Sequence, residues 1–166
     1  MPVEIVTERL TLNSLEPSAS AFILELLNSP GWLQFIGDRN ITNIADADAY
    51  INRIRTSPFI RYWVVKLKAA EAPIGIVTYI KRDFFDHHDL GFAFLPAHEG
   101  EGYAFEAAKA VLQYLAANTT ETQVLATTNV DNYRSVHLLE KLGFMLEREI
   151  EIEKRRLKLY SVTIAL

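Results

Sequence analysis

The sequence predicts a single α/β domain built on a mixed sheet. Three observations support this fold class: a length of 166 residues, about half of them apolar; β-rich runs that alternate with helical patterns; and a strand–helix–strand unit from Leu90 to Thr128. A chain of this length forms one domain with a substantial core, so we treat residues 1–166 as one domain. Because a helix joins the two strands of that unit, we expect them to lie parallel.

The first elements are a strand and two helices. Residues 9–13 alternate apolar and polar side chains, which predicts a strand with Leu10 and Leu12 on one face. A helix is expected over residues 17–27, with proline at its first position, and Gly31 breaks the pattern. A second helix is expected over residues 46–55, with Asp46 as its N-cap.

The middle of the chain is rich in β-forming residues. The runs at 62–67 and 74–80 are joined by a short connection, which predicts an antiparallel hairpin. A polar loop follows over residues 81–89. The next strand covers residues 90–95 and ends at a proline.

The last third contains two helices and three strands. An apolar stripe at three- and four-residue spacing predicts a helix over residues 102–118, followed by a strand at 124–128. A second helix is expected over residues 133–142, with Gly143 as its stop. Two strands, at 144–153 and 157–164, then flank a charged turn. The predicted order is β-α-α-β-β-β-α-β-α-β-β.

Composition excludes several classes of protein. The chain has 17 basic and 21 acidic residues, a net charge of −4, which is not the basic footprint of a nucleic-acid-binding protein. No apolar run approaches the ~18 residues that span a bilayer, and the first residues do not have a signal-peptide pattern. There is no cysteine, which rules out a disulfide or a cysteine-linked acyl intermediate. We therefore expect a cytoplasmic protein that binds neither nucleic acid nor membrane.

The stretch HEGEGYAFEA, residues 98–107, lies between a predicted strand and a predicted helix. The first N–H groups of a helix are unpaired and carry a partial positive charge, and glycine lets the backbone approach a phosphate closely. The acidic side chains of Glu99 and Glu101 oppose anion binding. From these residues alone, an anion-binding loop and a plain strand-to-helix turn both remain open.

Three stretches resemble a known family. They are TERLTL at residues 7–12; LGFAFLP at 90–96 with GEGYAFEA at 100–107; and Asn129, Asn132 and Ser135 followed by LEKLGF at 139–144. In this order and spacing they are similar to the GNAT superfamily of acyl-CoA-dependent N-acetyltransferases, within it the ribosomal-protein-alanine N-acetyltransferase type. The resemblance implies a mostly antiparallel sheet of about seven strands flanked by helices, with a central parallel pair that splays apart.

The resemblance also implies acetyl-CoA as co-substrate. The backbone of Phe92, Phe94 and Leu95 would pair with the pantetheine arm as an added strand does. The side chain of Asn132 would either cap a helix or contact the same arm. The residues whose backbone amides would hold the diphosphate are Glu99, Gly100, Glu101, Gly102, Tyr103 and Ala104.

Direct transfer requires a neutral amine, a donor to the oxyanion and a proton for the leaving thiolate. Ser135 is the first candidate to protonate the leaving thiolate. Many family members use a tyrosine for this step, but its position is occupied by Leu139 here, and Tyr133 is a weaker substitute. Asp89 matches an acidic residue that the family often has before LG, and it would orient the amine or relay its proton. The alternatives are a capping or solvent-facing hydroxyl for Ser135 and a solvated turn for Asp89.

The sequence also bears on metal binding, on the acceptor and on oligomeric state. Adjacent side chains diverge on an extended chain, so His87 and His88 do not predict a metal site. The acceptor is expected to be a primary amine. A protein N-terminus is one candidate, because an α-amino pKa near ~7.7–8 leaves more neutral amine at pH 7 than a lysine side chain does. Peptides, small amines, and an acyl-CoA-binding module without turnover stay open, as does a homodimer.

Overall fold

The structure, a computed structural model, describes residues 3–164, so the predicted domain limits at 1 and 166 lie outside the described residues. These residues form one eight-stranded sheet of order β1-β2-β3-β4-β5-β6-β8-β7, in which only β5 and β6 pair in parallel. The strands are β1 (Glu4–Val6), β2 (Leu10–Ser14), β3 (Ile60–Leu67), β4 (Pro73–Ile80), β5 (Asp89–Phe94), β6 (Gln123–Asn129), β7 (Met145–Ile152) and β8 (Arg155–Thr163). The predicted mixed sheet with one parallel pair is confirmed.

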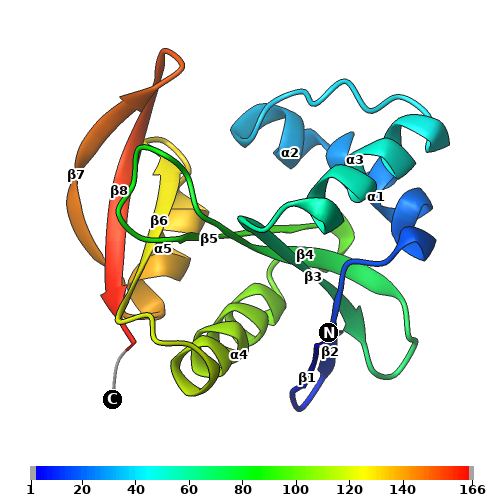
Figure 1. Ribbon diagram of the computed structural model, residues 1–166, viewed down its shortest axis with the longest axis horizontal. Coiled ribbons are helices and arrows are strands. Elements are labelled where there is room, and N and C mark those ends of the chain that lie inside the picture. Colours follow the sequence, from blue (N-terminus) through cyan, green and yellow to red (C-terminus); the bar gives the residue numbers. More distant parts are fainter. Residues whose placement is uncertain (1–2, 165–166) are drawn as a thin grey trace.

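Helices cover both faces of this sheet (Figure 1). We call the face under α1, α2 and α3 the front face and the face under α4 and α5 the back face. The helices are α1 (Ser20–Leu27), α2 (Pro30–Phe35), α3 (Ile44–Thr56), α4 (Tyr103–Asn118) and α5 (Tyr133–Lys141), with 3-10 turns η1 (Pro17–Ala19) and η2 (Pro96–His98).

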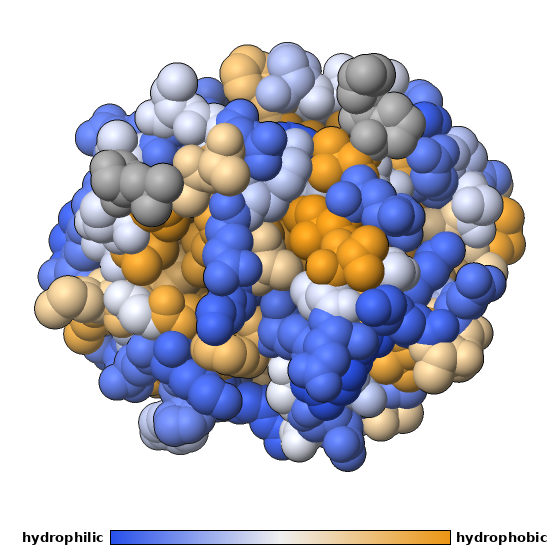
Figure 2. Space-filling view, turned by 90° about the horizontal axis from the view of Figure 1, so that it is seen from below, coloured by the Kyte–Doolittle hydropathy of each residue, from blue (hydrophilic) through white to orange (hydrophobic). Residues whose placement is uncertain are grey.

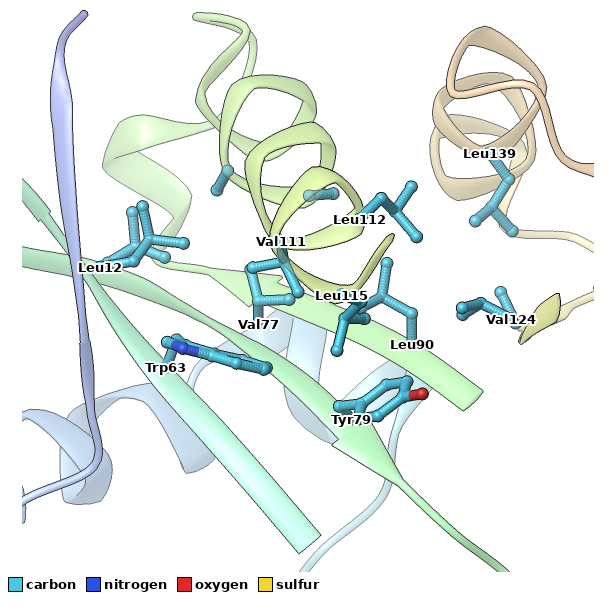
Figure 3. Close-up of a cluster of buried hydrophobic side chains, with 14 of the residues drawn as sticks. Leu12, Trp63, Val77, Tyr79, Leu90, Val111, Leu112, Leu115, Val124 and Leu139 are labelled. Atoms are coloured by element: carbon cyan, nitrogen blue, oxygen red, sulfur yellow. The ribbon is translucent and has the colours of Figure 1, made fainter. Parts of the chain in front are cut away.

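The back core lies between α4 and the central strands (Figure 3). The predicted apolar stripe of α4 is buried there, and Val111 and Leu115 are fully enclosed against Trp63 and Val77. Enclosing a side chain of this size contributes about 1.5–3 kcal/mol. This packing fixes where α4 begins, and with it the loop that precedes the helix.

The front core joins α1, α2 and α3 to the other side of the same strands. It contains Ile23, Leu26, Trp32 and Ile51, which pack with Ile76 of the sheet. Side chains on a strand alternate between faces, so one strand serves both cores. Ala93 and Leu95 of the β5 region pack in this front core, whereas Phe92 and Phe94 pack in the back core.

The structure differs from the sequence-based elements in the N-terminal half. A strand of three residues, β1, precedes the first predicted one and is too short to show alternation. Gly31, expected to end a helix, lies inside the short helix α2. Helix α3 begins at Ile44, because its N-cap is Asn43, whose side chain accepts a hydrogen bond from the Asp46 N–H at 2.8 Å.

The final hairpin also turns earlier than predicted. Glu153 and Lys154, with φ of 52° and 65°, form a two-residue connection of the type that matches strand twist. Arg155, expected in the turn, is therefore the first residue of β8. Because the turn comes earlier, the side chain of Arg155 reaches the end of α2.

Seen from the side of α4 and α5, apolar surface forms separate patches divided by hydrophilic side chains (Figure 2). Within residues 3–164, no helix combines the length and the apolar character needed to cross a bilayer.

Candidate active site

The parallel strands β5 and β6 pair at a single point and then diverge. Asp89 lies opposite Leu125, and the Leu125 N–H donates to the His88 carbonyl at 2.9 Å. Backbone groups alternate between the two edges of a strand, so the N–H and C=O groups of Phe92 and Phe94 face the same edge as the His88 carbonyl. Along that edge β6 has moved away, which leaves these backbone groups open to an added strand-like ligand.

Leu95 requires a correction to the predicted set. Its N–H donates to the Ile74 carbonyl at 2.8 Å on the β4 side, and its carbonyl accepts from the His98 N–H at 3.0 Å. Both backbone groups are therefore engaged within the protein, and only Phe92 and Phe94 remain available for the expected pairing.

The loop before α4 has the backbone geometry of an anion-binding turn. Gly100 and Gly102 both have φ of +81°, a left-handed conformation that favours glycine. Gly102 is the N-cap of α4, and the first intrahelical bond runs from the Glu106 N–H to the Gly102 carbonyl.

In the described part of the chain, the N–H groups of residues 100–105 donate to no protein acceptor. That stretch includes Glu101, Tyr103 and Ala104 of the predicted set. Glu99 is different, because its N–H makes a weak 3.3 Å bond to the Pro96 carbonyl in η2. The open donors thus begin at Gly100.

Two arginines from distant parts of the sequence contact this loop. Glu99 forms an ion pair with Arg134 of α5. The carbonyl of Glu101 accepts from Arg9 Nη1 at 3.0 Å, and the Arg9 guanidinium lies over the Tyr103 ring at 4.4 Å. The loop is therefore flanked by two cations that its own sequence does not contain.

Arg9 is held by Glu106, a residue of the first turn of α4. Glu106 accepts from the Arg9 backbone N–H at 2.9 Å, from Arg9 Nε at 2.7 Å and from the Thr7 hydroxyl at 2.6 Å. Burial alone would raise the pKa of Glu106, but these bonds outweigh it and lower the pKa below its usual value. Two stretches of the family resemblance, TERL and YAFEA, are thus joined by one carboxylate. Sequence spacing did not reveal this contact.

Asp89 is buried rather than solvated, which rules out the turn alternative. Its side chain is 6% exposed, and its Oδ2 accepts from Arg82 Nε at 2.7 Å. Burial raises the pKa of Asp89, and Arg82 opposes the shift only in part. By strand alternation, its side chain is on the front face with Ala93. A buried carboxylate of raised pKa, at the point where β5 and β6 part, is suited to exchanging a proton with an amine.

The start of α5 brings the other predicted residues to the loop. Asn132 is the N-cap, as its side chain accepts from the Ser135 N–H at 3.3 Å. Arg134, through its ion pair with Glu99, places this first turn of α5 beside the glycine loop. Ser135 is half-buried there, whereas Tyr133 is 76% exposed. Ser135 is therefore the better placed of the two.

The histidines of the 81–89 loop are used in packing. His88 stacks on Tyr79, with ring centroids 4.3 Å apart, and its Nδ1 lies 3.5 Å from Glu121. Burial lowers the pKa of His88. Within the described residues, no group of three or more His, Asp or Glu side chains is arranged to hold a metal ion.

A sheet whose central parallel strands diverge beside a glycine-rich helix N-terminus defines an acyl-CoA N-acetyltransferase fold. The profile of the family described as Acetyltransferase (GNAT) domain matches residues 9–145, and the chain belongs to this family. The family uses acetyl-CoA as co-substrate, and the protein is an acetyl-CoA-dependent N-acetyltransferase.

Known proteins are similar to this chain in sequence or in fold over most of its length. The uncharacterized N-acetyltransferase YnaD of Bacillus subtilis is 26% identical over 147 residues, which is 87% of this chain and 84% of that protein. The ribosomal-protein-S5-alanine acetyltransferase of Vibrio fischeri superposes with a TM-score of 0.83 at 18% identity, covering 97% and 96% of the two chains. The spermidine N-acetyltransferase of Vibrio cholerae, in complex with CoA and spermine, gives 0.82 at 21% identity, covering 95% and 96%.

Proposed function

We propose that the protein transfers an acetyl group directly from acetyl-CoA to a primary amine, in a complex that holds both substrates together. The run of unpaired N–H groups from Gly100 to Phe105, at the start of α4, carries this proposal. Such groups bind a diphosphate without cationic side chains, because the helix dipole and the N–H dipoles point the same way. The residues present therefore fit the co-substrate.

The open edge of β5 provides the second part of the fit. The backbone groups of Phe92 and Phe94 would bond the pantetheine amides, which adds one more strand where β6 diverges. An N–H on the same edge would also be a donor to the oxyanion that forms at the thioester carbonyl. The sheet thus orients the thioester without a dedicated side chain.

Two side chains are assigned to proton transfer. Asp89, on the front face, would orient the amine and take its proton directly or through water. Ser135, at the start of α5, would donate to the departing thiolate, with the exposed Tyr133 as substitute. The chain contains no cysteine, so no cysteine-linked acyl-enzyme forms.

The pKa of the acceptor amine supports one class of acceptor, because only the neutral amine attacks the thioester. A protein N-terminus has a lower pKa than a lysine side chain, which supports an N-terminal α-amine as acceptor. Similarity in fold to an enzyme named for a ribosomal-protein alanine supports the same class. An acceptor that is a ribosomal protein would also place the enzyme in the cytoplasm.

Calorimetry with acetyl-CoA and thiol release on peptide N-termini and small amines test these proposals. Binding with transfer to a peptide N-terminus supports the proposed acceptor, and binding without transfer to any of these amines would contradict it.

Gly102→Glu tests the diphosphate loop. We expect the variant to weaken acetyl-CoA binding at least about tenfold, because a charge of the wrong sign and a strained left-handed residue enter the loop. The matched control is Glu101→Gln, which removes an exposed charge and keeps both glycines. It should bind as tightly as the parent or more tightly. Unchanged affinity in the glycine variant, by calorimetry, would remove the loop from the site.

Ser135→Ala tests the proton donor. Turnover should fall about tenfold or more, with a smaller change in acetyl-CoA affinity, because the hydroxyl acts on the leaving group in the transition state. Steady-state kinetics with both substrates varied separate the two effects. Equal turnover would exclude Ser135 from the chemistry.

We also propose a homodimer, supported by the exposed edge strand β7. Met145 and Leu146 are 75% and 52% exposed there, beside a hollow of about 530 Å³ bounded by α5 and β8. Light scattering on the parent and on Leu146→Glu measures the mass, and a monomeric parent would refute the dimer.

A further inference from the structure

Three arginines gather on the front face beside the point where β5 and β6 diverge. We name Arg39, Arg82 and Arg155 the front arginine cluster. Arg82 bonds Asp89 on the β5 side, and Arg155 Nη2 bonds the side chain of Asn129 at 3.0 Å on the β6 side. The cluster therefore has members on both sides of the divergence.

Arg39 and Arg155 approach each other at the end of α2. A β-carbon at Gly37 would lie 3.7 Å from Arg155 Nη1 and 3.8 Å from Arg39 Nη1, so both guanidinium groups reach one small region. Arg155 donates to the carbonyls of Ile36 and Phe35, at 2.8 and 2.6 Å, but to no carboxylate in the described structure. Arg39 makes no hydrogen bond or ion pair within residues 3–164.

Arg39 and Arg82 also share a neighbour. Burial and the Tyr50 hydroxyl, 2.8 Å away, raise the pKa of Tyr62 well above its usual value, and Arg39 and Arg82 both act against that shift. Arg39 and Arg82 therefore both contribute to the electrostatic field at the Tyr62 hydroxyl, which lies on the front face.

Two members of the cluster have no carboxylate partner. Asp89 is the only carboxylate that pairs with a member of the cluster in the described part of the chain. Arg39 and Arg155 therefore form no ion pair there, in a protein whose net charge is −4. Arginine binds carboxylate and phosphate oxygens with paired donors, and the guanidinium of Arg39 offers such a fork, whereas both Nη atoms of Arg155 already donate within the protein and Arg155 adds its positive charge.

We propose that the acceptor amine carries an oxyanion, a carboxylate or a phosphate, close to its amino group, and that the front arginine cluster binds this oxyanion. The inference rests on the proposed acetyl transfer and specifies its acceptor. The cations also lower the pKa of a bound ammonium group, so they favour the neutral amine that attacks the thioester. A polycation such as a polyamine is disfavoured by the same charges.

Matched acceptors test the proposal in two arms. The peptide arm compares Ala-Asp-Gly-Phe with Ala-Asn-Gly-Phe, and the small-molecule arm compares phosphoethanolamine with ethanolamine, with spermidine as a polycation. Thiol release gives kcat/KM, and calorimetry on CoA-saturated protein gives affinity without turnover. We expect the anionic member of at least one pair to be preferred about tenfold or more in both measurements. The arm that shows the preference identifies a peptide or a small molecule as the source of the oxyanion.

Arg39→Gln is the decisive variant, because Arg39 is exposed and its side chain makes no hydrogen bond or ion pair in the described structure. It should reduce the preference to near parity and leave acetyl-CoA affinity unchanged. Arg156→Gln is the matched control, since Arg156 is 69% exposed and pairs with Glu149. It should keep the preference.

The outcomes separate the two proposals. A preference in binding with no transfer to any amine would reject the proposed reaction and retain the oxyanion site. Parity in both arms, a better rate with spermidine, or an equal effect of the two arginine variants would overturn the site.

Discussion

At the scale of single residues, acidic side chains of the site are matched by arginines from elsewhere in the sequence. Glu99 pairs with Arg134, and Asp89 pairs with Arg82. The carboxylate of Glu101 forms no such pair in the described residues, because Arg9 contacts its backbone carbonyl. In the proposed reaction, the diphosphate would therefore bind through main-chain donors, whereas the acceptor would be recognised by side chains.

Asp89→Asn should change the pH dependence of stability in a defined direction. Burial raises the pKa of Asp89 above its unfolded value of about 3.9. Such a carboxyl stabilises the folded state below the unfolded pKa, and the contribution is lost as pH rises through the folded pKa. The Tm of the variant minus that of the parent should therefore increase from pH 4 to pH 7 in circular dichroism melts.

Arg82→Gln provides the complementary measurement. Removal of the cation that opposes the shift raises the pKa of Asp89 further, so the Tm of this variant should fall more between pH 4 and pH 7 than the Tm of the parent does.

For Asp89→Asn, a Tm difference from the parent that stays constant between pH 4 and pH 7 would mean that Asp89 is not held in a desolvated position.

At the scale of elements, periodic segments could be predicted and short ones could not. The stripe of α4 and the hairpin of β3 and β4 follow from side-chain spacing alone. Helix α2 has six residues and contains Gly31, so no local pattern announces it. Its C-terminus is held instead by Arg155 and Asn129, which donate to the Phe35 carbonyl at 2.6 Å each.

The candidate site also contains features that could be predicted from the sequence and features that could not. The position of the glycine loop between a strand and a helix could be predicted from local sequence, whereas its anion-binding role and the open edge of β5 followed from the family resemblance. Arg9, Arg39 and Arg155 could not be, because folding brings them to the site from sequence positions far from the loop. Leu95 was assigned incorrectly because resemblance to a motif does not say which edge of the strand each amide faces.

Arg155→Gln tests how α2 is held. The variant loses a charged donor to the Ile36 and Phe35 carbonyls, so the last turn of α2 should open more often. Hydrogen exchange followed by mass spectrometry should show faster exchange in peptides covering residues 30–37. Helix α4 should be unchanged. Arg156→Gln is again the control, and equal protection of α2 in all three proteins would contradict the assignment.

At the scale of the whole molecule, the sheet consists of two parts joined at one parallel pair. The parts are β1 to β5 and β6 to β8, and in the described residues the register of β5 and β6 contains only the Asp89–Leu125 pair. Helix α4 packs across the back, and Arg155 links α2 to β6 and β8 at the front. A ligand bound along the open edge of β5 would add hydrogen bonds beside the single pair that joins the two parts of the sheet.

This arrangement predicts a large effect of acetyl-CoA on thermal stability. A ligand that binds only the folded state at about 100 times its Kd stabilises by about 2.7 kcal/mol, which raises the Tm of a domain of this size by roughly 5–11 °C. Acetyl-pantetheine at the same concentration makes the strand-like contacts to Phe92 and Phe94 but lacks the diphosphate, so it should raise the Tm much less. Differential scanning fluorimetry measures both shifts. Because the two ligands differ at the end that reaches the start of α4, equal shifts would show that the free N–H groups from Gly100 onward contribute nothing to binding, and the basis for the proposed loop would be lost.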